Sequence, residues 1–270
     1  MSFSIAGKTA IVTGAANGVG LAIARHFANH GANVMFADMD ESSMREEIGD
    51  DANKDDSNVR IFAGDLREKL TIANLLSATI DAFDHVDILV NASRQMIASD
   101  PLNPDDDAVE MLLSQNLLTS LRLTQAIAKR MIKQAEESGR DEGSAGTIIN
   151  LSSIAARRAH PELLGYSVSC AALDQMTRSM AVALAPNRIR VNAVAFGSVM
   201  SASLRDTLRD DDESRADIVA HTPLNRIARA RELVEAVQFL ASEGAAFMTG
   251  QIVTVDGGRT LLDSVAAPAH

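Results

Sequence analysis

The chain has 270 residues, 46% of them hydrophobic and only 3% aromatic, and carries a formal net charge of -11 at pH 7. That apolar content is enough to bury a large core. The acidic charge repels phosphate backbones, and the few aromatic rings leave little surface on which bases can stack. We therefore expect no nucleic-acid partner.

A single cysteine cannot form a disulfide within the chain, and it fits a reducing compartment. The first residues lack the apolar run of a secretory signal. No stretch approaches the ~18 uninterrupted apolar residues of a membrane span. We therefore expect a cytoplasmic protein without a membrane partner.

Apolar, partly β-branched runs alternate with segments of helical spacing along the chain, with no linker or repeat. The predicted strands are residues 9–13, 33–37, 59–63, 86–90, 147–151, 189–195 and 251–255. The predicted helices are residues 21–30, 41–50, 68–83, 105–135, 164–185 and 231–240. This alternation predicts a single doubly wound α/β domain with a mostly parallel sheet of about seven strands.

Residues 14–20 read Gly-Ala-Ala-Asn-Gly-Val-Gly and lie between the first strand and the first helix. Glycines there let the backbone approach a pyrophosphate, whose charge meets the positive helix N-terminus. Three glycines often mark only a tight turn, but the strand-to-helix position is the one that a dinucleotide site requires. The residues expected to contact a dinucleotide are Gly14, Asn17, Gly18, Val19 and Gly20.

Asp38 ends the second predicted strand. An acid there accepts hydrogen bonds from the hydroxyls of the adenosine ribose and repels a 2′-phosphate. Neither Ala15 nor Met39 supplies a cation for such a phosphate. We therefore predict NAD rather than NADP; the alternative is an ordinary surface acid beside Asp40 and Glu41.

Several motifs together resemble the short-chain dehydrogenase/reductase family over about residues 5–260. Besides the glycine turn, they are Asp65-Leu66, Asn91-Ala92, Asn116, Ser153, Tyr166, Val191-Asn192-Ala193 and Asp256-Gly257-Gly258. The resemblance implies a Rossmann fold, with a cofactor half of about residues 5–150 and a catalytic and substrate half of about residues 151–260. It also implies an NAD-dependent oxidoreductase for a small secondary alcohol or its ketone, without a metal.

The resemblance assigns roles along the cofactor. Asp65 and Leu66 would border the adenine, Asn91 would lie along the cofactor, and Val199 would lie beside the nicotinamide carboxamide. The further residues implied to bind the cofactor are Asp65, Leu66, Asn91, Ala92, Ser93, Tyr166, Gly197, Val199 and Ser201.

Ser153 and Tyr166, the only tyrosine, would form the acid–base pair. The phenol gives or takes the proton while hydride moves between nicotinamide and the substrate carbon, and the serine holds the substrate oxygen. In the family, a lysine four residues after the tyrosine binds the nicotinamide ribose and lowers the pKa of the tyrosine. Asn116 would support a water chain that reaches this lysine.

Cys170, the only cysteine, stands at that lysine position. No lysine follows Lys133, and the wider spacing of enoyl reductases fails because residue 173 is a leucine. A thiol carries no positive charge and donates only weak hydrogen bonds. We expect Cys170 to pack as a small apolar group rather than to act as a nucleophile.

The pKa of an unperturbed tyrosine is about 10, so about one molecule in a thousand is ionised at pH 7. Alcohol oxidation needs that tyrosinate as a base, whereas carbonyl reduction uses the phenol as an acid. We therefore expect slow activity biased towards reduction, with oxidation rising at alkaline pH. The alternative is a degenerate NAD(H)-binding regulator or partner subunit.

Two further departures from the family pattern are Ser93-Arg94 in place of a glycine and Phe196 in place of a proline. Arg94 either brings a compensating cation towards the cofactor or is a solvated loop arginine, and the second is the simpler interpretation. Phe196 is expected to pack or to line a pocket. His160 and the Arg157-Arg158 pair are given no role.

Residues 198–224 occupy the substrate-loop position of the family. Met200, Leu204 and Leu208 recur at helical spacing, which suits either a helix that closes over an apolar ligand or ordinary surface packing. In the family, two long helices pack against symmetry mates. The helix after Tyr166 is rich in small residues, so we expect a homotetramer or at least a dimer.

Overall fold

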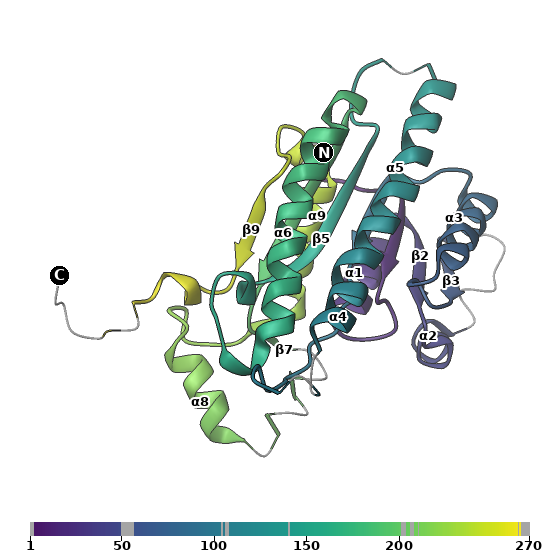
Figure 1. The fold of residues 1–270 in the computed structure, drawn as a ribbon. Coiled ribbons are helices and arrows are strands. Elements are labelled where there is room, and N and C mark those ends of the chain that lie inside the picture. Colours follow the sequence, from purple (N-terminus) through teal and green to yellow (C-terminus); the bar gives the residue numbers. More distant parts are fainter. Residues whose placement is uncertain are drawn as a thin grey trace.

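The computed structural model describes residues 3–49, 57–103, 105, 108–139, 141–200, 204–205, 208–209, 211–263 and 265. Seven parallel strands form one sheet in the order β3-β2-β1-β4-β5-β6-β9 (Figure 1). They are β1 (Thr9–Thr13), β2 (Asn33–Asp38), β3 (Val59–Ala63), β4 (Ile88–Asn91), β5 (Gly146–Ser153), β6 (Ile189–Phe196) and β9 (Ile252–Val255). The predicted Rossmann-like α/β domain with a seven-stranded sheet is confirmed.

Helices cover both faces of the sheet. On one face lie α1 (Gly18–Asn29), α2 (Glu41–Ile48) and α9 (Ala230–Ala241). On the other face lie α3 (Lys69–Phe83), α5 (Thr119–Glu137) and α6 (Leu164–Leu184). The chain reverses its direction of winding between β1 and β4, which places a crevice at their carboxyl ends.

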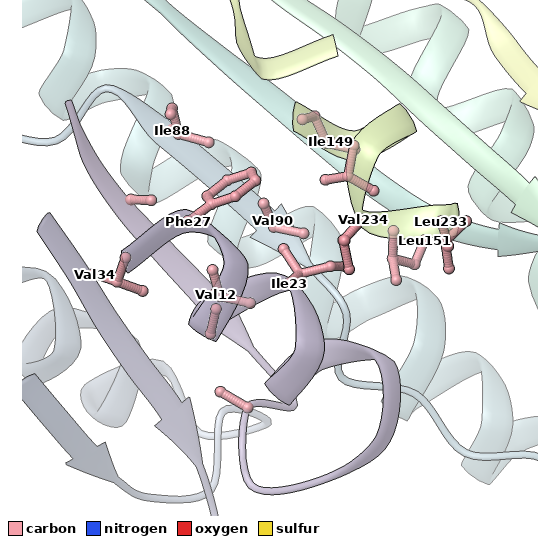
Figure 2. Packing of buried hydrophobic residues seen from close by; sticks show 14 of the residues in the cluster. Val12, Ile23, Phe27, Val34, Ile88, Val90, Ile149, Leu151, Leu233 and Val234 are labelled. Carbon is pink, nitrogen blue, oxygen red and sulfur yellow. The ribbon is translucent and has the colours of Figure 1, made fainter. Parts of the chain in front are cut away.

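Side chains alternate between the two apolar cores, because successive residues of a strand point to opposite faces. Val12 packs into the core beneath α1 and α9, whereas its neighbour Ile11 packs into the core beneath α3, α5 and α6. Figure 2 shows Val12 among Ile23, Phe27 and Val234, which come from α1 and α9. These contacts hold the first strand and first helix in fixed register, and with them the glycine turn between the two.

The predicted helical region 105–135 is not one continuous α-helix. It begins as α4 (Val109–Leu112), passes through a π-helical turn (Leu113–Leu118) and continues as α5. The Thr119 hydroxyl donates to the Ser114 carbonyl at 3.0 Å, five residues back, which partners a carbonyl in the wider turn. Such turns are frequent at functional sites, and this one carries Gln115 and Asn116.

The predicted helical stripe of Met200, Leu204 and Leu208 is wrong at Met200. Met200 lies in the short strand β7 (Val199–Met200), which pairs with β8 (Ala228–Arg229), so it does not start a helical stripe. Leu208 is buried and Leu204 half-buried, while residues 201–203, 206–207 and 210 lie outside the described part of the chain. Helix α8 (Asp212–Ala220) follows.

Residues 50–56 lie outside the described part of the chain, and α5 ends at Glu137, two residues beyond the predicted helical region 105–135. None of the helices within the described ranges combines the length and the apolar character needed to cross a membrane.

Candidate active site

A cavity of about 540 Å³ opens at the carboxyl ends of the strands, at the switch between β1 and β4. Ligands of open α/β sheets bind in this kind of crevice. Most of the residues predicted to bind a dinucleotide line it, namely Gly14, Asn17, Gly18, Val19, Gly20, Asp38, Asp65, Leu66, Ala92, Ser93 and Tyr166.

The glycine turn allows two close backbone approaches. A Cβ on Gly14 would lie 2.8 Å from the Ser93 backbone nitrogen, and a Cβ on Gly20 would lie 2.0 Å from the Gly14 carbonyl oxygen. At Gly18, with φ +57°, a Cβ would meet no protein atom within 4 Å. The Asn17 side chain makes no capping bond, so the first amides of α1 remain available to an anion. This cradle fits a pyrophosphate.

Asp38 is fixed at the cavity wall by backbone amides. Its Oδ2 accepts from the Ala16 N–H at 3.1 Å, and its Oδ1 accepts from the Asp40 N–H at 3.1 Å. Each carboxylate oxygen keeps a lone pair for a further donor, such as a ribose hydroxyl.

Asp65 is held by Arg67, a cavity residue that the sequence did not single out. The Arg67 guanidinium donates to both carboxylate oxygens, with Nη2 2.6 Å from Oδ2. This hydrogen bonding lowers the pKa of Asp65 below its ordinary value. The charge of Arg67 is therefore already matched by a carboxylate.

The loop after β4 is clamped on both sides. The Thr13 hydroxyl accepts from the Ala92 and Ser93 amides, both at 3.1 Å. The Asn116 side chain pairs with the Gln95 backbone, accepting from its N–H at 2.8 Å and donating to its carbonyl at 2.9 Å.

Asn116 also links this loop to α6. Its remaining Nδ2 hydrogen goes to the Ser169 hydroxyl at 3.0 Å, and that hydroxyl donates to the Tyr166 carbonyl at 2.8 Å. Both amide hydrogens of Asn116 are thus engaged within the protein.

A second cavity of about 1240 Å³ adjoins the first. Ser153, at the end of β5, and Tyr166, on α6, both line it and are 7% and 3% exposed. Burial raises the pKa of the Tyr166 phenol, and the charge of Arg94 and a hydrogen bond from Ser153 offset part of that effect. The predicted acid–base pair therefore comes together where the cavities meet, with its phenol protonated at neutral pH.

Cys170 lies behind this wall. It is 3% exposed and packs with Ala108, Leu112 and Tyr166, and it is not among the residues that line either cavity. Burial raises the pKa of its thiol. The thiol therefore packs as a small apolar group, as expected.

Arg94 is not the solvated loop arginine that the sequence favoured. Its guanidinium carbon lies 4.1 Å from the centre of the Phe196 ring and 5.8 Å from the centre of the Tyr166 ring. Its Nη1 donates to the Ser152 carbonyl at 3.1 Å. Phe196 is 5% exposed and lines the second cavity, as expected.

Comparisons with known proteins agree with this geometry. A family model described as enoyl-(acyl carrier protein) reductase matches residues 14–260. Oxidoreductase UcpA of Salmonella typhimurium is 31% identical over 268 residues, which cover 97% of this chain and 98% of that protein. The chain belongs to the short-chain dehydrogenase/reductase family.

Two solved structures extend the likeness. A 7α-hydroxysteroid dehydrogenase complexed with NADH and 7-oxo glycochenodeoxycholic acid has a TM-score of 0.85 at 28% identity, covering 95% of this chain and 96% of its own. A gluconate 5-dehydrogenase from Burkholderia cenocepacia, in complex with NADP and tartrate, has a TM-score of 0.84 at 27% identity, covering 97% and 98%. This short-chain dehydrogenase/reductase is therefore an oxidoreductase with a nicotinamide dinucleotide cofactor and a small-molecule substrate.

The remaining residues implied by the family resemblance fall in three places. Gly197 and Val199 line the second cavity. Asn91 lines neither cavity, because its amide is buried and donates to Asn150 Oδ1 at 2.8 Å. Ser201 lies outside the described residues.

Sequence reasoning missed several lining residues. Besides Arg94, which the sequence offered as a compensating cation, the first cavity also contains Met39, Gly64, Arg67, Gln95, Met96, Gln115 and Leu151. Their signal was position, since five of these seven lie within six residues after a predicted strand end, while Leu151 ends a predicted strand and Gln115 neighbours Asn116. Arg158 and His160, which received no role, line the second cavity together with Arg259. No group of three potential metal ligands gathers anywhere in the described ranges.

Proposed function

We propose that this protein is an NAD(H)-dependent oxidoreductase that interconverts a secondary alcohol and its ketone, slowly and with a bias towards reduction. The observation that carries the proposal is the pairing of Ser153 with the buried Tyr166 phenol at the junction of the two cavities. The cofactor half would comprise about residues 5–150 and the catalytic and substrate half about residues 151–260.

The dinucleotide would lie along the glycine turn, with its pyrophosphate at the N-terminus of α1 and its adenosine ribose at Asp38. When bound, the nicotinamide supplies or accepts the hydride. NAD is favoured over NADP because the Asp38 carboxylate would repel a 2′-phosphate, and Arg67 on the same wall is held by Asp65.

In reduction, the Ser153 hydroxyl would donate a hydrogen bond to the substrate carbonyl, and the Tyr166 phenol would donate the proton to that oxygen. The raised pKa keeps the phenol protonated at neutral pH, which suits this direction. Oxidation needs the same phenol to lose its proton first. Cys170, at the family's lysine position, offers a neutral thiol to that step.

The second candidate is an NAD(H)-binding regulator or partner subunit without turnover. It is favoured by the position of Cys170 away from both cavities. It is also favoured by Asn116, whose amide hydrogens both go to protein atoms rather than to a water chain.

A carbonyl screen with NADH and NADPH tests the two functions. The panel should include substrates with a carboxylate, because Arg158 and Arg259 line the substrate-side cavity. We expect reduction with NADH by the natural protein, and a loss of at least about 100-fold in Tyr166→Phe with NADH binding retained.

One result of the carbonyl screen would reject the oxidoreductase function. If the natural protein binds NADH but reduces no carbonyl that Cys170→Lys reduces, the oxidoreductase proposal fails and the regulator is supported.

We also propose a homotetramer or dimer that forms through α5 and α6. Figure 1 shows these two long helices side by side on one face of the sheet. The outer side of α6 exposes Leu164, Val168 and Val182, which are apolar side chains that a symmetry-related copy would cover.

A further inference from the structure

We propose that Arg94 supplies, from the loop after β4, the fixed positive charge that acts on Tyr166 in this active site. Arg94 is a positioning residue in this scheme, since it acts on the substrate through the tyrosine. The catalytic consequence rests on the proposed oxidoreductase function, whereas the contact between cation and phenol does not.

Arg94 stands where such a charge is needed. Arg94 and Tyr166 both line both cavities, so Arg94 lies where the predicted cofactor site meets the predicted substrate site. Its guanidinium lies 5.8 Å from the centre of the Tyr166 ring. A guanidinium stays charged throughout the range in which a phenol titrates, so its field favours the tyrosinate at any working pH.

The sheet order explains how the cation arrives there. Arg94 follows β4, Ser153 ends β5 and Phe196 ends β6, and these three strands are neighbours whose carboxyl ends meet at one edge. Ser153 and Phe196 are directly paired across β5 and β6. Residues far apart in the sequence are thereby brought together around the phenol.

The guanidinium is held in place by its neighbours. It lies 4.1 Å from the centre of the Phe196 ring, a distance at which a planar guanidinium gains from the π face, and it donates to the Ser152 carbonyl. The backbone on either side is clamped, with Ser93 bound to Thr13 and Gln95 bound to Asn116. The Arg94 side chain therefore loses little further conformational freedom when its charge stabilises the tyrosinate.

Few other charged groups act on the phenol. The neighbours that shift the pKa of Tyr166 are Arg94, Cys170 and Ser153, and only Arg94 is a cation. Asp174 faces Cys170 one helical turn further on. Within the described ranges, no ion pair joins Arg94 to a carboxylate that would cancel its charge.

The departures from the family pattern thus have a common explanation. The cation absent at position 170 is present at position 94, and Phe196 provides the ring on which it rests. The charge acts on the same phenol from the loop after β4 rather than from α6, the helix that carries Tyr166.

The protein offers a direct test, because Tyr166 is its only tyrosine and it contains no tryptophan. The near-ultraviolet absorbance of tyrosinate therefore reports this one group. We would read it after rapid jumps to alkaline pH, before unfolding, in the natural protein and in Arg94→Met, Arg94→Lys and Arg259→Met. Arg259→Met is the matched control, since Arg259 lines the same cavity but does not act on Tyr166.

We expect the titration midpoint of Arg94→Met to lie about one pH unit above that of the natural protein. Arg94→Lys keeps the charge and should titrate close to the natural protein, and Arg259→Met should not shift. Adding Cys170→Lys to Arg94→Met should restore the natural midpoint. If that double variant does not fold, the comparison of Arg94→Met with Arg94→Lys still decides.

Equal midpoints in the natural protein and Arg94→Met would overturn the inference. The titration requires no turnover, so it separates this inference from the proposed function. If the midpoint of Arg94→Met is raised but the natural protein reduces no carbonyl, the inference about Arg94 stands and the proposed oxidoreductase function is rejected. If the natural protein reduces a carbonyl but Arg94→Met titrates at the same midpoint, only the inference about Arg94 is rejected. If the inference and the proposed function both hold, Arg94→Met should oxidise an alcohol about tenfold more slowly than the natural protein at a given pH below the midpoint.

Discussion

Tyr166 is subject to two opposing influences. Burial among Ala108, Leu112 and Cys170 favours the neutral phenol, and the nearby Arg94 guanidinium favours the anion. Burial is the larger effect, so the pKa stays above its ordinary value. A side chain in this state suits proton donation more than proton removal.

We expect the rate of alcohol oxidation to rise from neutral to alkaline pH, while carbonyl reduction changes little until the phenol ionises. The sign follows from the raised pKa, because the useful base appears only as the pH approaches it. The same group contributes stability that is fully present below the unfolded-state pKa and is lost as pH rises through the folded-state pKa. Initial rates in both directions across this range provide the measurement.

Tyr166→Phe is the control for that profile, since it removes the titrating group. An oxidation rate at pH 7 that already equals its alkaline maximum would contradict the expectation.

Asp38 should set the cofactor preference. We expect Asp38→Asn to bind NADH about tenfold or more weakly, because hydrogen bonds to a charged acceptor contribute roughly 1.5–3 kcal/mol. It should also lose much of its discrimination against NADPH, since the repelling charge is gone. Titration of each cofactor by calorimetry measures both effects.

Asp40→Asn is the matched control, because Asp40 is an adjacent acid that caps α2 rather than lining the cavity. If Asp38→Asn bound both cofactors as the natural protein does, Asp38 would be an ordinary surface acid.

At the scale of elements, the packing of α1 against the glycine turn requires a residue without a Cβ at position 20. The requirement comes from the close approach of the Gly14 carbonyl and not from the backbone conformation of Gly20. Gly20 has ordinary helical backbone angles, yet a Cβ there would collide with the Gly14 carbonyl. We expect Gly20→Ala to lower the free energy of unfolding by about 1–3 kcal/mol and to abolish NADH binding, because α1 must shift away from the turn. Urea denaturation and cofactor titration test this.

Asn29→Gln serves as the control, because it adds one carbon at an exposed position at the end of the same helix. A Gly20→Ala protein as stable as the control would mean that α1 accommodates the extra carbon without strain.

At the scale of the whole molecule, assembly would bury the exposed side of α6. Val182 is 78% exposed there. If α6 meets its symmetry mate, Val182→Glu places like charges opposite each other and should convert the assembly to smaller species. Light scattering during size-exclusion chromatography measures the mass.

Leu70→Glu is the control, since Leu70 is 74% exposed on α3, outside the proposed interface. A natural protein that is monomeric at micromolar concentration would reject the assembly.

The sequence by itself determined the alternation of strands and helices, the parallel sheet and the glycine turn. These are local features, because strand and helix periodicity and glycine spacing are written within a few consecutive residues. It also determined that Ser153 and Tyr166 belong together, through the spacing of a known motif. The π-helical turn at Asn116 and the pairing of β7 with β8 were not predicted, since two-residue strands and a single wide turn leave no periodic signal.

Only the tertiary structure decided the position of Arg94. Its neighbours Ser152, Tyr166 and Phe196 lie on three other elements, and none of these contacts is encoded in the residues next to it. The order of β4, β5 and β6 in the sheet brings them together. The physical reason is that a sheet edge gathers strand ends irrespective of their distance along the chain, so a charge lost on a helix can be replaced from a loop.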